Sequence, residues 1–221
     1  MSTREPRVME LHSEVLRRLE NHRARLPVFG LTANMNKTYQ GEMSAESRTQ
    51  LISRVWKCLS RHLIPVIVGE TAFDVASGTT IVSGDALMHV LAMGLETVQR
   101  CIFVTDVAGL YTQDSKIFAN ATLVRQVRAV RHSSANQNQG RGCSERSHVT
   151  EAMCSKLQWV NYIMRDAPHV SEVAICQVSD VDRVPAVAGH ASDDDTRSWT
   201  SVVRKSTSAI PICSLILPRN S

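Results

Sequence analysis

Three groups of residues in this chain have the types and the spacing to handle a phosphate group. Ser83, Gly84 and Asp85 open an apolar stretch with helical character, and the run Thr105–Tyr111 follows a short apolar segment. Lys156 lies within a third, periodic segment. The N-terminus of a helix presents free N–H groups and a partial positive charge to an anion. The pattern therefore predicts phosphate handling.

The elements that must position these groups can be predicted from the apolar pattern. Two apolar runs, 64–68 and 101–105, indicate buried strands, and we expect them to lie in one sheet. A strand, a turn at Ser77-Gly78 and a returning strand are predicted across 68–81. The remaining predicted elements are helices at about 7–25, 44–62 and 149–164, and strands at 28–31, 173–176 and 202–203.

The order and spacing of these residues resemble the amino acid kinase superfamily, and within it the isopentenyl phosphate kinases. That family reads P-V, G-D, an Asp, a Gly and I-x-S-G-D before a helix, then T-D-x-x-G-x-Y-x-x-D after a strand. The matching residues here are Pro65, Val66, Gly69, Asp74, Gly78, Ile81, Ser83, Gly84, Asp85, Thr105, Asp106, Gly109, Tyr111 and Asp114. Glutamate 5-kinase shares the G-D helix start and the T-D-x-x-G-L-Y part, so the choice within the superfamily stays open.

The resemblance implies a fold and an activity. The fold is α/β, a three-layer αβα sandwich around a mostly parallel central sheet. The activity is ATP-dependent phosphorylation of a small phosphorylated acceptor, from isopentenyl phosphate to isopentenyl diphosphate in isoprenoid biosynthesis. Mg²⁺ is carried by the nucleotide phosphates, and no metal ligands of the protein itself are implied.

The resemblance also assigns roles to individual residues. Asp85 and Lys156 are implied to be catalytic, Asp85 by organising the lysines around the transferring phosphoryl group. The residues implied to bind the nucleotide are Thr105, Asp106, Gly109, Tyr111, Met153 and Lys156. The residues implied to bind the acceptor substrate are Gly69, Ser83 and Gly84.

Each role has a structural alternative that the sequence leaves open. The alternative for Asp85 is a plain N-cap of the helix, a position that Asp favours. For Asp106 and Gly109 it is a turn that only closes a strand into a loop. For Lys156 it is a solvated lysine on a helix, and for Tyr111 it is a side chain that covers the core.

Several positions depart from the family pattern. Glu151-Ala152 stands where the family has Gly-Gly beside the phosphates, and Glu70 replaces an Asp. No Lys-x-Gly-Gly element precedes Val8, so we expect an N-terminally truncated fold that lacks its first strand and Gly-rich loop. Whether the chain is an enzyme then depends on that element in the native protein. The alternatives are a truncated or degenerate, non-catalytic kinase fold that acts as a binding partner, and an amino-acid kinase similar to glutamate 5-kinase.

The composition and charge of the chain argue against some classes of protein. The net charge of +4 over 221 residues is small and the basic residues are scattered, which argues against nucleic acid as a partner. The six cysteines form no C-x-x-C pair, so we expect reduced thiols and a cytoplasmic location. We expect no membrane span, partners that are ATP and a small phosphate compound, and exposed apolar surface that permits a homodimer.

The expected organisation is one domain with a tail. A partial kinase domain is predicted at 1–205, interrupted at 131–148 by a polar, flexible insertion rich in Ser, Asn, Gln and Gly. A C-terminal tail is predicted at 206–221.

Overall fold

The computed structural model describes residues 17, 27–31, 38–39, 42–69, 71–113, 115–129, 151–180, 198–204 and 210–211. At positions 38, 39, 42, 151, 152, 210 and 211 it describes the backbone alone. The predicted insertion at 131–148, nearly all of the predicted helix at 7–25, Glu70, Asp114 and most of the tail at 206–221 lie outside the described residues. The chain divides into two compact units, Met1–Leu95 and Glu96–Ser221.

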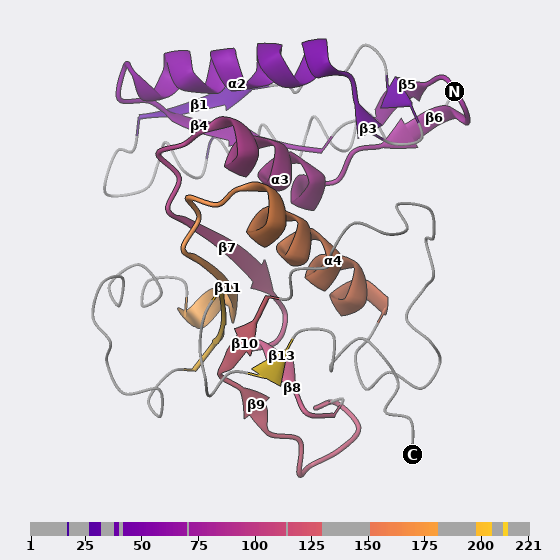
Figure 1. Ribbon diagram of the computed structural model, residues 1–221, viewed down its shortest axis with the longest axis vertical. Helices are drawn as coiled ribbons and strands as arrows, with labels where there is room; N and C mark the ends of the chain where they lie inside the picture. The colour runs from indigo at the N-terminus through magenta and orange to yellow at the C-terminus, as the bar shows by residue number, and fades with distance from the viewer. Residues whose placement is uncertain are drawn as a thin grey trace. The chain divides into compact units, whose positions relative to one another are not determined.

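The first unit contains a two-stranded parallel sheet and a helix that packs on it. Strand β1 (Val28–Leu31) pairs with β4 (Ile64–Ile67). Helix α2 (Ala45–Leu59) contacts β4 and runs along this pair (Figure 1). The N-cap of α2 is Ser44, whose Oγ accepts a hydrogen bond from the N–H of Ser47 at 3.1 Å. This confirms the helix start that the sequence predicts.

A second sheet in this unit has the strand order β3-β2-β5-β6. Its strands are β2 (Thr38–Tyr39), β3 (Glu42–Met43), β5 (Thr71–Asp74) and β6 (Gly78–Ile81). The turn between β5 and β6 is closed by the carboxylate of Asp74, which accepts the N–H groups of Ala76 and Ser77 at 3.0 and 2.9 Å. Gly78 follows with a φ of +80°, a conformation that favours glycine. The predicted strand, turn and returning strand are confirmed.

Helix α3 (Gly84–Gly94) follows β6 and packs against α2. The two helices approach closely at Gly94, where an added methyl group would lie 2.1 Å from Cδ1 of Ile52. A larger residue at the end of α3 would therefore need the side chain of Ile52 to move.

The second unit is built on a five-stranded sheet in the order β13-β10-β12-β11-β7. Its strands are β7 (Arg100–Thr105), β10 (Gln126–Arg128), β11 (Glu172–Gln177), β12 (Thr200–Val203) and β13 (Ile210–Pro211). Three of its four pairings are parallel, and the pairing of β11 with β12 is antiparallel. A separate antiparallel pair, β8 (Leu110–Tyr111) with β9 (Leu123–Val124), follows β7 along the chain. A single turn of 3-10 helix, η1 (Val178–Asp180), follows β11.

Helix α4 (Glu151–Asp166) packs on β11 in this unit. Its fully buried residues recur at three- and four-residue steps, which is the pattern of one helix face: Leu157, Val160, Ile163 and Met164. The helix ends two residues before Pro168, and the stop before this proline is as predicted. Strand β11 is buried along its middle, which explains its uninterrupted apolar run.

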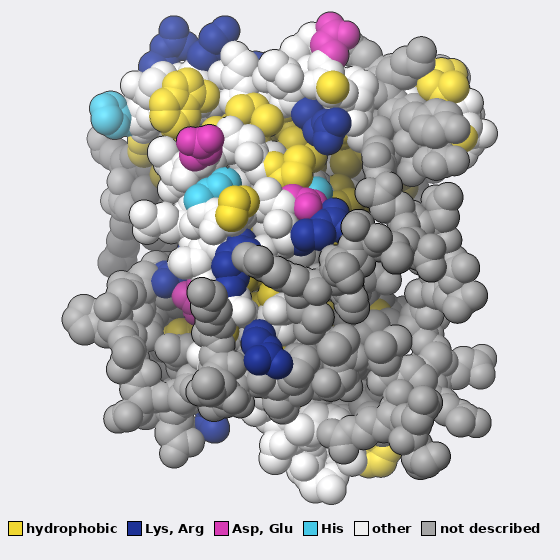
Figure 2. Space-filling view, in the orientation of Figure 1, with side chains coloured by type: hydrophobic (Ala, Val, Ile, Leu, Met, Phe, Trp, Pro, Cys, Tyr) yellow, Lys and Arg dark blue, Asp and Glu magenta, His cyan; other side chains and the backbone are white. Residues whose placement is uncertain are grey.

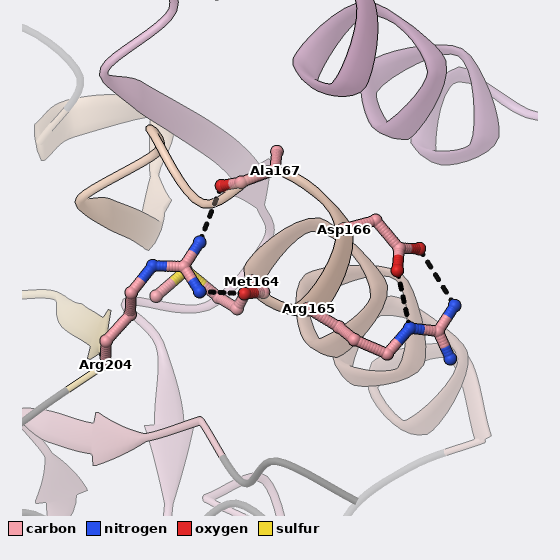
Figure 3. Close-up of polar contacts among 5 residues, drawn as sticks. All are labelled: Met164, Arg165, Asp166, Ala167 and Arg204. Atoms are coloured by element: carbon pink, nitrogen blue, oxygen red, sulfur yellow. Dashed lines mark hydrogen bonds and ion pairs between the residues drawn. The ribbon is translucent and has the colours of Figure 1, made fainter. Parts of the chain in front are cut away.

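The C-terminal end of α4 is held by a side chain from just beyond β12. The guanidinium of Arg204 donates N–H groups to the carbonyl oxygens of Met164 and Ala167 (Figure 3). It also donates to the carbonyl oxygen of Val170 at 3.1 Å. The last carbonyl groups of a helix have no partners within the helix. Arg204 satisfies that of Met164, and through this bond it joins α4 to the strand β12.

The α/β class and the mostly parallel main sheet are confirmed, but one detail of the predicted sheet is wrong. The apolar runs 64–68 and 101–105 do not share a sheet, because among the described residues β4 pairs with β1 and β7 pairs with β11. An apolar run shows that a strand is buried and carries no information on which strand lies beside it. The boundary between the two compact units, after Leu95, falls between these runs.

One cysteine is not a reduced thiol, although the sequence led us to expect reduced thiols throughout. Cys58, Cys101 and Cys176 are free and buried, and burial raises the pKa of the Cys101 thiol to about 11. Cys154 is disulfide-bonded, so the expectation of reduced thiols is wrong there. A disulfide depends on the distance between two cysteines in the fold, which their spacing in the sequence does not give.

The described surface is mixed in character. Figure 2 shows hydrophobic side chains at the surface in the region of α2, a helix on which Trp56 and Leu59 are exposed.

No helix in the described ranges is both long enough and apolar enough to cross a bilayer. Within the same ranges, no three His, Cys, Asp or Glu side chains lie together as a potential metal site.

Candidate functional site

The start of α3 brings Ser83, Gly84 and Asp85 together, and Ser83 caps the helix. The Oγ of Ser83 accepts a hydrogen bond from the N–H of Ala86 at 3.2 Å. Asp85 is half-buried and lies inside the first turn, one residue after the first helical position. The alternative that Asp85 is the N-cap is therefore wrong. An acid in the first turn is stabilised by the helix dipole, and its carboxylate is not used as the cap.

The two glycines beside this helix start, Gly69 and Gly84, differ in whether packing requires a glycine. A methyl group added to Gly69 would lie 2.4 Å from the carbonyl oxygen of Val82, so packing of the backbone requires this glycine. Among the described residues, a methyl group added to Gly84 would meet no heavy atom within 4 Å. Packing within this part of the chain gives no reason for a glycine at position 84. The methyl group added to Gly69 would also lie 3.5 Å from the N of Gly84, so the two predicted acceptor-binding glycines are neighbours.

In the second unit, the turn after β7 begins with a hydrogen-bonded threonine. The Oγ1 of Thr105 lies 3.0 Å from both the N and the O of Val107, accepting the N–H and donating to the carbonyl. This local bonding is typical of threonine turns. Thr105 thus shapes the turn through its own side chain.

Asp106 is the most exposed of the residues predicted to bind the nucleotide. Its carboxylate accepts a hydrogen bond from the Nζ of Lys116 at 2.7 Å, and both side chains are largely exposed. The hydrogen bond from Lys116, and then its charge, lower the pKa of Asp106. Lys116 was not among the predicted site residues. A lysine ten residues after Asp106, in a segment without periodicity, gave no signal that it faces this carboxylate.

The end of the same turn is packed against a distant strand. A methyl group added to Gly109 would lie 2.3 Å from Oγ1 of Thr200, the first residue of β12. Position 109 therefore requires a glycine, because Thr200 packs against it. Tyr111 follows in β8, where it is half-buried and pairs with Leu123. Thr200 was also not predicted from the sequence, because its contacts come from about 90 residues earlier in the chain.

Lys156 lies on the side of α4 that faces the sheet. It is half-buried, and its Nζ lies 4.9 Å from the centroid of the Phe103 ring in β7. An ammonium group over an aromatic face is attracted by the ring. The alternative of a fully solvated lysine does not fit this position. Met153, one turn earlier in α4, is also half-buried.

The predicted site residues thus form two groups, one in each compact unit. Gly69, Ser83, Gly84 and Asp85 belong to the first unit, around the start of α3. The second group belongs to the second unit. Its members are Thr105, Asp106, Gly109 and Tyr111 in and after the turn that follows β7, and Lys156 and Met153 on α4. Phe103, two residues before Thr105 on β7, links Lys156 to the strand that leads into the turn.

Both the sequence and the fold are similar to known proteins. The model of the amino acid kinase family matches residues 5–175. No curated protein sequence matched significantly.

Solved structures show the same fold. The product complex of isopentenyl phosphate kinase from T. acidophilum is 18% identical, with a TM-score of 0.54 over 90% of this chain and 73% of that one. A second isopentenyl phosphate kinase structure is 21% identical, with a TM-score of 0.56 over 77% of this chain and 57% of that one. Aspartokinase III from E. coli, in complex with aspartate and ADP, is 16% identical, with a TM-score of 0.52 over 88% of this chain and 38% of that one.

Proposed function

The chain belongs to the amino acid kinase family, and from this premise we propose that it transfers the terminal phosphoryl group of ATP to a small phosphorylated acceptor. The acceptor that we propose is isopentenyl phosphate, with isopentenyl diphosphate and ADP as the products. The sequence pattern around Gly84 and Asp106 supports this choice, and two of the similar structures are isopentenyl phosphate kinases.

In the proposed reaction an oxygen of the acceptor phosphate attacks the γ-phosphorus of ATP. The bond from that phosphorus to the oxygen bridging to the β-phosphate breaks, and the electron pair leaves with ADP. Such a transfer needs little covalent chemistry from the protein, because its rate depends on alignment and on neutralisation of phosphate charge. The groups required are cations, backbone N–H groups and a residue that orders the cations.

The observation that carries the proposal is the open backbone at Gly84. Packing explains the glycines at 69 and 109, but a methyl group at 84 would meet no atom of the described residues within 4 Å. Gly84 also opens α3, where N–H groups without helical partners point outward from the helix start. A glycine in this place is explained if the acceptor phosphate lies against its backbone. Ser83 and Gly69 complete the acceptor side.

On the nucleotide side, we propose that the turn Thr105–Tyr111 and Lys156 hold ATP. Lys156 is half-buried, which keeps its charge from being fully screened by water. The side chains present suit a triphosphate because Lys156 supplies positive charge. Mg²⁺ bound by the phosphates would supply further charge neutralisation, and its preference for phosphates and water over protein cages fits these side chains. Asp85, in the first turn of α3, is proposed to be a catalytic residue.

A nucleotide-binding protein without turnover is the second candidate. Glu151 stands where the family has glycine, and a carboxylate at this position repels the phosphates of a nucleotide. Measuring ATP binding and turnover on one sample separates the two candidates. A nucleotide-binding protein without turnover would bind ATP and form no ADP.

The experiment incubates the purified full chain with Mg-ATP and, in parallel, isopentenyl phosphate, glutamate or aspartate. We expect ADP formation with isopentenyl phosphate alone. Turnover with glutamate or aspartate would instead identify an amino-acid kinase. Absence of turnover with all three acceptors, together with measurable ATP binding, would favour the second candidate.

Two variants test the proposed roles. Gly84→Ala should not lower the thermal unfolding midpoint, and it should raise the KM for isopentenyl phosphate at least about tenfold. Lys156→Gln should lower kcat by about a hundredfold, in the range for losing one charge-stabilising group. Lys57→Gln on α2 is the matched control, because it removes a lysine from a helix outside either proposed site. Unchanged kinetics in both test variants would contradict the proposed sites.

A further inference from the structure

Thr200 makes two buried hydrogen bonds that fasten the turn after β7. Its side chain is fully buried. Its hydroxyl donates to the carbonyl oxygen of Val124 at 2.7 Å and accepts the N–H of Leu110 at 2.8 Å. A hydroxyl has one hydrogen to donate, so the bond to Val124 leaves its oxygen to accept from Leu110.

The hydroxyl of Thr200 also packs directly against Gly109. A methyl group at Gly109 would lie 2.3 Å from Oγ1 and 2.8 Å from the N of Thr200. The end of the turn is therefore fixed by both a hydrogen bond and a steric contact. The start of the turn is fixed by Thr105, whose hydroxyl is bonded to Val107. Between these two fixed ends lies Asp106, whose side chain is largely exposed.

We propose that Thr200 is a positioning residue for nucleotide binding. Through Leu110 and Gly109 it holds the backbone of the Thr105–Tyr111 turn in the conformation that receives ATP. Because Thr200 is fully buried, it acts through the turn and not by touching a ligand. The inference rests on the proposed function, in which this turn binds the nucleotide.

The test compares side chains of similar shape with and without a hydroxyl. Thr200→Val removes the hydroxyl and leaves the N–H of Leu110 buried without an acceptor, a costly arrangement. We expect the KM for ATP, and the Kd for a non-hydrolysable ATP analogue, to rise about tenfold. The KM for isopentenyl phosphate should stay within about twofold of the wild type. Thr200→Ser keeps the hydroxyl and should restore the KM for ATP to within about twofold.

The matched control is Thr122→Val, which removes an exposed threonine hydroxyl close to β9. The Oγ1 of Thr122 lies 3.2 Å from that of Thr112 at the surface. This variant should keep the wild-type KM for ATP. If Thr200→Val does not fold, Thr200→Ala replaces it, because it also lacks the hydroxyl and adds no methyl group beside Leu110.

A second readout does not require activity. Exchange of the Leu110 amide hydrogen with solvent, measured by NMR, should be slow in the wild type and in Thr200→Ser. It should be at least about tenfold faster in Thr200→Val, because the hydrogen bond that protects the amide is gone. A folded Thr200→Val protein with a wild-type KM for ATP would overturn the proposal, whatever its exchange rate. A wild-type protein that binds no ATP would overturn the proposed function, and the exchange rate of Leu110 would then decide whether Thr200 fastens the turn.

Discussion

The Nζ of Lys116 lies 2.7 Å from Oδ2 of Asp106, and this ion pair is exposed to solvent. The hydrogen bond from Lys116, followed by its charge, holds the pKa of the Asp106 carboxyl below its ordinary value. A carboxyl group whose pKa is lower in the folded protein stabilises the fold at pH above its unfolded pKa. That contribution is lost as the pH falls through the folded pKa. Because the pair is exposed, its contribution is small and decreases with salt.

We predict that Lys116→Gln returns the pKa of Asp106 toward its ordinary value. The measurement is an NMR titration of the Asp106 side-chain carboxyl in the wild type and the variant, at low ionic strength. Lys57→Gln is the control for loss of a lysine elsewhere and should leave the Asp106 titration unchanged. An identical Asp106 titration in the wild type and Lys116→Gln would show that the pair does not form in solution.

A second prediction concerns alkaline pH and Cys101. Burial raises the pKa of this thiol from 9.0 to about 11, so the folded protein keeps its proton where the unfolded chain loses it. Stability then falls as the pH rises from about 9 to 11, by up to about 2–3 kcal/mol. Urea unfolding at pH 8 and pH 10 should show a smaller loss of stability for Cys101→Ala than for the wild type. Equal losses in the two proteins would exclude Cys101 as a cause.

The contact between Lys156 and Phe103 predicts an energetic coupling between α4 and β7. A cation over an aromatic ring at a partly exposed position is worth about 0.5–1 kcal/mol. In a double-mutant cycle, Lys156→Met and Phe103→Leu should therefore show a coupling energy of this size in urea unfolding. Lys57→Met combined with Phe103→Leu is the control for loss of a lysine from another helix, α2, and should show no coupling. Additive effects of Lys156→Met and Phe103→Leu would mean that the cation does not rest on the ring.

The two neighbouring glycines at 69 and 84 should respond differently to the same substitution. Gly69→Ala places a methyl group 2.4 Å from the carbonyl oxygen of Val82, and we expect the free energy of unfolding to fall by about 1–3 kcal/mol. Gly84→Ala adds a methyl group where none of the described residues has an atom within 4 Å, and alanine is favoured over glycine in a helix. Its free energy of unfolding should stay equal or rise by up to about 1 kcal/mol. Urea unfolding of both variants measures these differences. A destabilised Gly84→Ala would contradict the argument that packing leaves position 84 open.

The local elements of this fold follow from short-range patterns in the sequence. Ser44 before a helical apolar pattern predicts the start of α2, and Pro168 predicts where α4 stops. The β5–β6 hairpin follows from Ser77-Gly78, and Gly78 has a positive φ. In each case the physical cause lies within a few residues of the signal, so a single sequence is enough to show it.

The parts that could not be predicted depend on residues far apart in the chain. The partner of β7 is β11, about 70 residues later, and no apolar pattern selects it. Thr200 reaches Leu110 across 90 residues, and a threonine at the start of a strand gives no signal of such a contact. Gly109 could not be explained from the sequence for the same reason, because the atom that requires a glycine there belongs to Thr200.

The last prediction compares two arginines at the end of α4, drawn together in Figure 3. Arg204 is half-buried and donates to three carbonyl oxygens, those of Met164, Ala167 and Val170. Arg165 pairs with its neighbour Asp166 at 2.6 Å, and its side chain is 46% exposed. Arg204→Met leaves several carbonyl groups without a donor, so we expect a loss of about 2–4 kcal/mol in the free energy of unfolding. Arg165→Met removes an exposed pair and should cost less than about 1 kcal/mol.

Arg204→Lys separates the charge of this side chain from its shape. The ammonium of lysine is a compact point charge, whereas the planar guanidinium directs its N–H groups to several acceptors at once. We therefore expect Arg204→Lys to recover less than about half of the stability lost in Arg204→Met. Urea unfolding of the three variants measures these differences. Full recovery by lysine would mean that the helix end requires only a positive charge, and equal losses in Arg204→Met and Arg165→Met would mean that solvent satisfies the carbonyls.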